Sequence, residues 1–341
     1  MKKINPFIFS VVFVLLAAGL SLMVGSTNIP LRTMFDVIIN ALKGTTSTLD
    51  PNGVYATILF NLRLPRLMLL ILVGASLAGS GAAYQGLFRN PLADPYLIGV
   101  ASGAGLGAVA AMTIQWPYST LGLLAIPLAA LLGGMAAVLV AAMLARVGKT
   151  VPTTNLILAG VVVSSFCTAV SSLLMINASG ELRRALVWLL GGATSSGWSP
   201  VLAVLPYALI GGITLLAMGH PLNVLQFGDE QAKQLGVPTT RVRVLTILAA
   251  TMMTAAAVAY AGIIGFVGLV VPHLVRMLWS GDYRKLIPLS FLFGAGLLLV
   301  TDVAARTVMA PQEIPVGIIT SLIGAPFFLW ILQRTKSQNY W

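Results

Sequence analysis

Nine carboxylates and two histidines are the side chains of this sequence that could carry acid, base or metal chemistry. His220 and His273 are far apart in the chain, and neither is accompanied by cysteine or acidic residues at metal-ligand spacing. The carboxylates are Asp36, Asp50, Asp94, Glu181, Asp229, Glu230, Asp282, Asp302 and Glu313. Almost all lie in polar segments or at the ends of apolar runs, and none form a pair of catalytic type. We therefore expect no enzyme activity, no metal site and no cofactor.

Asp302 is the carboxylate closest to the interior of an apolar run. Proton-coupled carriers normally need an ionisable group at membrane depth. Arg306 follows one helical turn later, which favours a structural ion pair. The sequence thus disfavours an ion-coupled secondary transporter, although sodium coupling through backbone carbonyls stays open.

A phosphate-binding loop is also missing. Gly148-Lys149-Thr150 resembles the end of such a loop, but Met143 occupies the position where the motif requires glycine. If ATP drives this protein, a separate ATPase subunit must hydrolyse it.

The elements that position these residues are apolar runs of membrane length. Of 341 residues, 58% are hydrophobic and 9% are charged, against about a quarter charged in soluble domains. Runs of about 20 residues can cross a bilayer. They lie at 7-25, 67-88, 95-114, 121-145, 153-176, 200-219, 244-262, 263-279, 286-304 and 314-333. The prediction is an all-α polytopic membrane protein, one transmembrane domain over 1-341 with ten spans; a cleaved signal peptide at the first run is the less favoured reading.

The distribution of positive charge predicts the orientation. With both termini in the cytoplasm, thirteen of the 20 Lys and Arg residues lie inside, as the positive-inside rule requires. The thirteen are Lys2, Lys3, Arg89, Arg146, Lys149, Lys233, Arg241, Arg243, Arg276, Arg284, Lys285, Arg334 and Lys336. The glycine-rich segment 183-199 is then a short outer-surface or re-entrant helix. Spans two to five and seven to ten enter from opposite sides, as in an inverted repeat.

Glycines recur within the spans. Gly99, Gly103 and Gly107 recur every four residues, and residues 262-276 contain three glycines, a proline, a histidine and an arginine. The glycines let helix backbones approach closely, and we expect packing to be their main use. Cys167 is a single cysteine inside span five, which excludes a disulfide framework.

Two polar features could bind partners. Arg63, Arg66 and Arg306 lie at the outer ends of spans two and nine, either as snorkelling anchors or as a basic rim for an acidic protein. The inner loop 220-243 has Leu225, Ala232 and Leu235 among polar residues, then Gly236 and Pro238 as a helix stop. This loop is either a docking helix pair or a solvated connector.

Several motifs resemble the FecCD-type permeases, the membrane subunits of binding-protein-dependent ABC importers for ferric siderophores, haem and cobalamin. They are Arg63-Leu-Pro-Arg66, the run from Gly81 to Pro95, the run from Gly262 to Arg276, Asp302-Val-Ala-Ala-Arg306, Glu313-Ile-Pro-Val-Gly317 and Gly324-Ala-Pro-Phe327. They occur in order over roughly residues 60 to 333.

The resemblance implies a multi-pass permease of the bacterial inner membrane that works as a homodimer, with an ATPase subunit and an extracytoplasmic binding protein. It implies docking of that protein at Arg63, Arg66 and Arg306, and a cytoplasmic gate at Thr153 and Thr154. It also implies an ATPase-coupling segment, formed by Gly228, Asp229, Glu230, Ala232, Leu235, Gly236 and Val237. An iron chelate is the first expected substrate, then cobalamin and haem.

Overall fold

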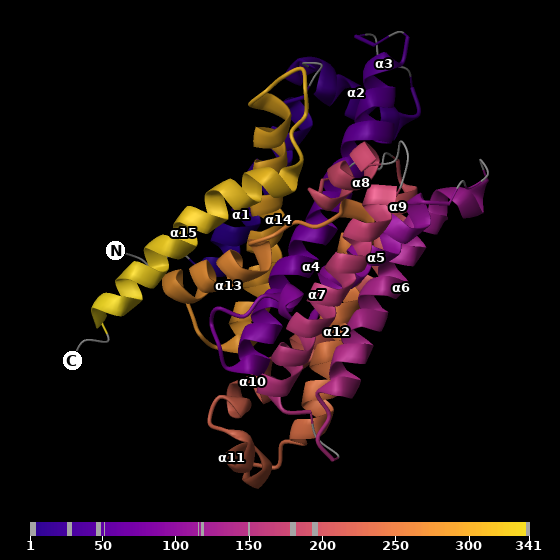
Figure 1. Cartoon of the computed structure of the whole chain (residues 1–341). Helices are drawn as coiled ribbons and strands as arrows, with labels where there is room; N and C mark the ends of the chain where they lie inside the picture. The colour runs from indigo at the N-terminus through magenta and orange to yellow at the C-terminus, as the bar shows by residue number, and fades with distance from the viewer. Residues whose placement is uncertain are drawn as a thin grey trace.

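The computed structural model describes residues 5-25, 29-45, 49-50, 52-114, 116, 119-148, 151-177, 182-192 and 197-338. Its regular elements are helices (Figure 1). In chain order they are α1 (Pro6–Met23), α2 (Leu31–Lys43), α3 (Val54–Thr57), the π-helix η1 (Ile58–Arg63), α4 (Leu64–Phe88), the 3-10 helix η2 (Pro95–Ile98), α5 (Val100–Met112), α6 (Thr120–Leu144), α7 (Thr153–Asn177), α8 (Leu182–Leu189), α9 (Ser199–Ala217), α10 (Gly219–Leu225), α11 (Asp229–Gln234), α12 (Thr239–Ala261), α13 (Val267–Leu278), α14 (Tyr283–Thr307) and α15 (Val316–Gln338).

The long helices form where the sequence is apolar, because a chain in lipid must satisfy its backbone hydrogen bonds internally. Polar side chains mark several starts: the Ser119 hydroxyl accepts a bond from Gly122 N at the start of α6, and the Asp282 carboxylate accepts one from Arg284 N at the start of α14. Each cap satisfies one of the free amides of the first turn.

The apolar helices follow the predicted spans. Within the described residues, seven helical stretches are long and apolar enough to cross a bilayer, and three shorter apolar helices cover Val100–Met112, Val267–Leu278 and Val316–Ile331. The short α5 and α13 have 13 and 12 residues, so each rises about 20 Å, less than a bilayer core of about 30 Å. The fold is therefore an all-α polytopic membrane protein, and the count of ten crossings stays a prediction.

Two predicted spans are not continuous helices. Span three begins as η2, and Gly99, at φ 92°, separates it from α5. Residues 262-266 are not helical and precede α13. Gly262 and Phe266 have φ of 65° and 67° in this stretch, the left-handed region that favours glycine. Broken spans of this kind are tolerated where neighbouring helices cover the backbone.

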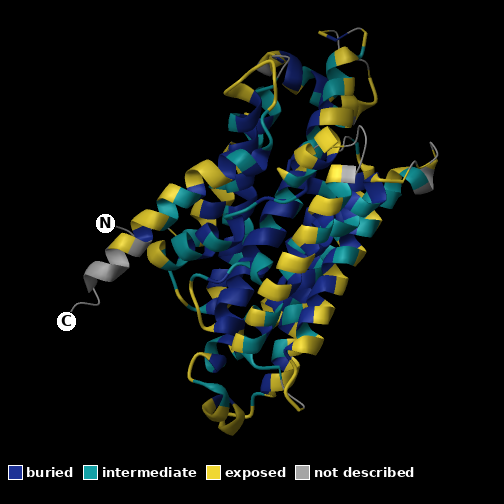
Figure 2. Cartoon of the chain, viewed as in Figure 1, coloured by how far each residue is buried: buried dark blue, intermediate teal, exposed yellow. Residues whose placement is uncertain are grey.

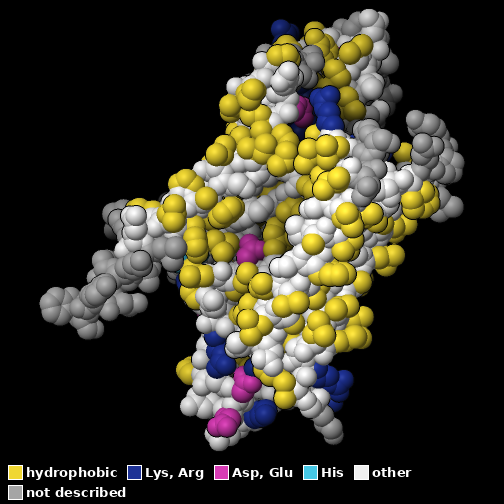
Figure 3. Space-filling view, viewed as in Figure 1, with side chains coloured by type: hydrophobic (Ala, Val, Ile, Leu, Met, Phe, Trp, Pro, Cys, Tyr) yellow, Lys and Arg dark blue, Asp and Glu magenta, His cyan; other side chains and the backbone are white. Residues whose placement is uncertain are grey.

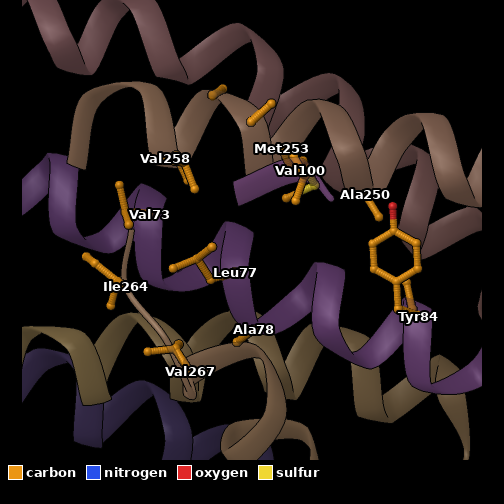
Figure 4. Packing of buried hydrophobic residues seen from close by; sticks show 14 of the residues in the cluster. Val73, Leu77, Ala78, Tyr84, Val100, Ala250, Met253, Val258, Ile264 and Val267 are labelled. Carbon is orange, nitrogen blue, oxygen red and sulfur yellow. The ribbon is translucent and has the colours of Figure 1, made fainter. Parts of the chain in front are cut away.

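Three helices form the centre of the bundle. Most residues of α4, α12 and α14 are buried, whereas α1, α6, α7 and α9 expose apolar side chains outward (Figure 2). Leu77 and Tyr84 of α4, Val100 of α5 and Met253 of α12 belong to the same buried cluster (Figure 4). Such a cluster closes the centre of the single chain by side-chain packing.

The packing pattern favours the predicted inverted repeat. α4 packs on α14, and α12 packs on α6. If α4 to α7 correspond to α12 to α15, these two contacts are equivalent. The interrupted helices α5 and α13 also occupy corresponding positions.

Glycines bring helices together as the sequence predicts. A Cβ on Gly103 would lie 2.4 Å from the Ala137 Cβ, and one on Gly107 would lie 2.0 Å from the Ala129 carbonyl oxygen. Gly99 differs, because its positive φ and not a close approach requires glycine. The α5–α6 contact therefore depends on the absence of side chains at 103 and 107.

The described residues between the first two apolar runs are mostly helical. They form α2, α3 and η1, and Ile29, Met34, Val37 and Leu59 make a small core of their own. The sequence has no long apolar run here, since the core combines one face of the short amphipathic α2 with Ile29 before it and Leu59 of η1.

The two ends of the bundle differ in what they carry. α2 and α3 lie at the end drawn uppermost in Figure 1, called the α2 end below; α10 and α11 lie at the opposite, α11 end. On the face drawn in Figure 3, most Lys, Arg, Asp and Glu side chains lie near these ends, with hydrophobic side chains over the middle. This distribution is expected of a protein that crosses a bilayer between its ends.

Candidate functional site

At the α2 end, a buried carboxylate joins two of the predicted arginines. Arg66 of α4 donates to Asp302 of α14, with Nη2 2.8 Å from Oδ1, and Arg306 places Nε 2.8 Å from Oδ2. The Asp302 side chain is fully buried. The pairing predicted between Asp302 and Arg306 is thus confirmed. A carboxylate buried in this way depends on its cationic partners.

Glu313 completes this cluster and was not singled out as a partner from the sequence. Its Oε2 lies 2.9 Å from Arg66 Nη1. The Glu313 side chain is 49% exposed and that of Arg66 is 23% exposed, so their contact lies at the surface. Arg66 therefore divides its donors between a buried and an exposed carboxylate.

Arg63 and Arg306 bind the end of α1. Arg306 donates to Val24 O at 2.8 Å and to Ser21 O at 3.3 Å, while Arg63 donates to Leu22 O and, at 3.2 Å, to Met23 O. The last carbonyls of a helix lack intrahelical partners, so the two guanidinium groups satisfy them.

The structure thus brings the three predicted docking arginines together but exposes them unequally. Arg63 and Arg306 are each 8% exposed, and only Arg66 reaches the surface appreciably. Sequence reasoning could not find the roles of Ser21 to Val24, because backbone carbonyls leave no mark on residue type. Docking at these arginines stays a prediction.

At the α11 end, the inner loop 220-243 forms two short helices, α10 and α11, and the predicted coupling residues lie in and beside α11. α11 ends in a hydrogen-bonded cap: Gly236 N donates to Lys233 O at 3.0 Å, and Val237 N donates to Ala232 O at 2.9 Å. Gly236 has φ 79°, which a residue with a side chain rarely adopts. The predicted helix stop is therefore confirmed. Most of 220-243 is helical, since it contains most of α10, all of α11 and the start of α12 at Thr239. The alternative of a solvated connector is therefore less favoured.

The apolar residues of this segment face two ways. Leu225 and Ala232 are buried against the chain, whereas Leu235 is 66% exposed. Phe227, between α10 and α11, is 68% exposed. A short helix pair with two protruding apolar side chains offers a contact surface for another protein.

Ion pairs hold α11 to the bundle. Asp229 Oδ2 lies 2.5 Å from Arg243 Nη2 on α12, and its Oδ1 lies 4.0 Å from Arg89 Nη2 at the end of α4. Gly228, at φ 106°, places Asp229 at the first position of α11. Glu230 is exposed on the same turn. Asp229 is therefore an anchoring residue of the segment.

Thr153 and Thr154 form the first turn of α7, directly after Pro152. Thr153 is half-buried and Thr154 is exposed. Both threonines are distant in sequence from the arginines of the α2 end and from α10 and α11. Their role as a gate stays a prediction.

The segment 183-199 enters the bundle. Its described part includes most of α8 and continues to Gly192, whose N donates to Ala261 O at 2.6 Å. A Cβ on Gly191 would lie 2.2 Å from Ile263 O, and Gly317 N, in α15, donates to Gly191 O at 3.4 Å. Of the two predicted placements, these contacts favour the re-entrant one.

The glycine-rich stretch 262-276 packs against several elements. A Cβ on Gly262 would meet Trp188 O at 2.2 Å, and one on Gly268 would meet Pro95 Cδ at 2.7 Å. A Cβ on Gly265 would meet only Ser321 Oγ, at 3.9 Å. The Tyr96 hydroxyl donates to Ile264 O at 2.9 Å, which ties η2 to the non-helical stretch. His273 lines a small depression with Pro91, Leu92 and Phe327, consistent with the expected packing role.

Comparison with known proteins assigns this arrangement to a family. The model of the FecCD transport family matches residues 12–334. An uncharacterised ABC transporter permease, YvrB of Bacillus subtilis, is 44% identical over 330 residues, which cover 96% of this chain and 92% of YvrB. The cobalamin import permease BtuC of Halobacterium salinarum is 46% identical over a match that covers 80% of this chain and 72% of BtuC. The hemin transport permease HmuU of Yersinia pestis is 40% identical over a match that covers 96% of this chain and 95% of HmuU.

A solved structure has the same fold. It is an ABC transporter assigned to the metal-chelate type, in an inward-facing conformation, with a TM-score of 0.80 and 30% identity. The match covers 96% of this chain and 98% of that one. With a family match over nearly the whole sequence and relatives of 40% identity or more, this chain belongs to the FecCD transport family.

Proposed function

We propose that this chain is the permease subunit of an ATP-driven importer that moves a large metal chelate into the cytoplasm. The observation that carries the proposal is the α10–α11 segment, which protrudes from the bundle with Phe227 and Leu235 exposed and Asp229 paired to Arg243. A carrier that works alone has no need of such a surface. Family membership supports the same reading.

The partners follow from the two ends. An ATPase subunit binds α10–α11, which places the α11 end in the cytoplasm. An extracytoplasmic binding protein docks at the α2 end, where the surface part of Arg66 can receive a carboxylate. Both termini are then cytoplasmic, as the charge distribution predicts. Thr153 and Thr154 act as the cytoplasmic gate.

A second copy of the chain completes the path. α7 exposes Leu158, Val162 and Phe166, and α15 exposes Leu322 and Ile323. Such faces can contact lipid or another helix, and the family implies a homodimer with the substrate path between the copies. Cross-linking of the purified protein after reconstitution into a bilayer tests whether two copies form a dimer.

A ferric siderophore is the first expected substrate. Relatives include the Fe(3+) dicitrate permease FecD of Escherichia coli and the Fe(3+)-citrate permease YfmD of Bacillus subtilis, at 39% and 38% identity, besides those for hemin and cobalamin. All these ligands are bulky metal complexes. Binding assays of the cognate binding protein with a ferric siderophore, cobalamin and haem separate the three, and affinity for none of them contradicts the substrate class.

Co-purification tests the proposal of an ATPase partner. The tagged chain should retain the ATPase subunit, and Leu235→Asp should release it, because a charge would enter the apolar contact. Leu235→Met is the matched control and should keep the subunit. An ATPase that never co-purifies with the unaltered chain would contradict the proposal.

A further inference from the structure

α10 is fastened to α4 and α14, two of the three central helices, which pack on each other along the bundle. Gln226, directly after α10, donates from Nε2 to Gly86 O at 2.9 Å, near the end of α4. Gly86 O lies in the last turn of α4 and accepts this bond in addition to the one from Arg89 N at 3.3 Å. Gln226 therefore ties α10 to the α11 end of α4.

Asn223 ties α10 to α14 with both ends of its amide. Its Nδ2 lies 2.5 Å from Asp282 Oδ1, and its Oδ1 accepts from Tyr283 N at 2.9 Å. Asp282 is itself the cap of α14, since it accepts from Arg284 N at 3.0 Å. The hydrogen bond from the Arg284 side chain, followed by the one from Asn223, keeps the pKa of Asp282 below its usual range. The carboxylate stays charged, which strengthens the Asn223 bond.

α4 and α14 form a stiff pair from one end of the bundle to the other. A Cβ on Gly74 or on Gly294 would each lie 2.4 Å from the carbonyl oxygen of the other residue. At the α2 end the pair is closed by Arg66 and Asp302. Close backbone contact and a buried ion pair leave little freedom for one helix to slide along the other.

We propose that Asn223 and Gln226 are positioning residues that make α10 move as one body with α4 and α14. A push on α10 is then delivered to the Arg66–Asp302 pair at the opposite end. This inference rests on the proposed function, because the push comes from an ATPase subunit bound at α10–α11. The two amides act through the helices that they hold and touch no substrate.

The contacts of Asn223 and Gln226 differ from those of α11, and the two sets of residues should therefore have different roles. Asp229 of α11 binds Arg243 and approaches Arg89, so its loss loosens the docking surface itself. Asn223 and Gln226 lie between the docking surface and the bundle. Their loss should leave the ATPase subunit bound but disconnect it from transport.

Three measurements on the whole complex in proteoliposomes test this role: ATPase retention, ATP hydrolysis and substrate uptake. In Asn223→Leu and Gln226→Leu, we expect retention and hydrolysis to persist, and uptake per ATP to fall about fivefold or more. Arg284→Ala is the matched control, because the exposed Arg284 side chain contacts the same Asp282 and, among the described residues, hydrogen-bonds to no other helix. It should keep uptake per ATP.

A covalent link distinguishes coupling from simple destabilisation. In a Cys167→Ala background, Asn223→Cys with Asp282→Cys should lose coupling, and joining the two thiols with a short bifunctional reagent should restore it. Unchanged uptake per ATP in the leucine variants, or failure of the link to restore coupling in a folded complex, overturns the inference. Failure of the unaltered chain to retain any ATPase subunit would instead contradict the proposed function.

Discussion

Arg66 of α4 and Asp302 of α14 are 236 residues apart in sequence, yet Nη2 and Oδ1 lie 2.8 Å apart. Asp302 is fully buried and also neutralises Arg306, which holds the end of α1. One carboxylate therefore links α1, α4 and α14 at the α2 end of the bundle.

Asp302→Asn should destabilise the fold strongly. The variant leaves two guanidinium groups beside a neutral amide, and breaking a buried ion pair costs about 3–5 kcal/mol. Thermal unfolding in detergent measures the loss. Glu313→Gln is the comparison: its partly exposed pair should contribute no more than about 1 kcal/mol. Equal melting temperatures for Asp302→Asn and the unaltered protein would refute the structural role of this carboxylate.

Glu313→Gln should instead strengthen docking of the binding protein. Glu313 occupies Arg66 Nη1 at 2.9 Å, where a partner's carboxylate would bind. Removing its charge frees that donor, so we expect tighter binding by surface plasmon resonance, with Arg66→Ala weaker than the unaltered chain. If Glu313→Gln and Arg66→Ala weaken binding equally, the two side chains act together and do not compete.

Gly107→Ala should disturb the α5–α6 contact. A Cβ there would lie 2.0 Å from Ala129 O, so the backbones must separate. Overpacking of this kind typically costs about 1–3 kcal/mol. Gly19→Ala is the control, because a Cβ on Gly19 would meet nothing within 4 Å. The melting temperatures of the two variants should differ; a Gly107→Ala protein as stable as Gly19→Ala would contradict the packing.

Asp94 gives the fold a pH dependence. Burial raises the pKa of this carboxyl to about 6, in the connection between α4 and η2. Since the folded state binds the proton more tightly than the unfolded state, the contribution of Asp94 to stability decreases as pH rises from about 4 to 6.

Asp94→Asn removes the free-energy cost of burying a charged carboxylate. Its side-chain oxygen can still accept the hydrogen bond from Tyr96 N, which Asp94 Oδ1 accepts at 2.7 Å. We expect the variant to melt higher than the unaltered chain at pH above 6, with the difference shrinking towards pH 4. A difference that is constant across this pH range would show that Asp94 does not titrate as described.

The sequence predicted what depends on local periodicity. The apolar runs locate the long helices, the spacing of Gly103 and Gly107 indicates a close contact, and the one-turn separation of Asp302 and Arg306 indicates an ion pair. Each signal is visible within a few residues of chain.

Contacts between distant segments could not be predicted in this way. Arg63 and Arg306 bind carbonyls at the end of α1, and any residue type supplies a carbonyl. The break before α13 needs Gly262 at φ 65° against Trp188 O, which depends on α8 entering the bundle. These features follow from tertiary packing, which cannot be predicted from the spacing of residues in the chain.

Uptake into proteoliposomes tests the central claim most directly. The purified chain is reconstituted with its ATPase subunit and binding protein, and a radiolabelled ferric siderophore is followed with and without ATP at the ATPase. We predict accumulation only when ATP, the ATPase subunit and the binding protein are all present. Accumulation by the chain alone, driven by a proton or sodium gradient without ATP, would contradict the account.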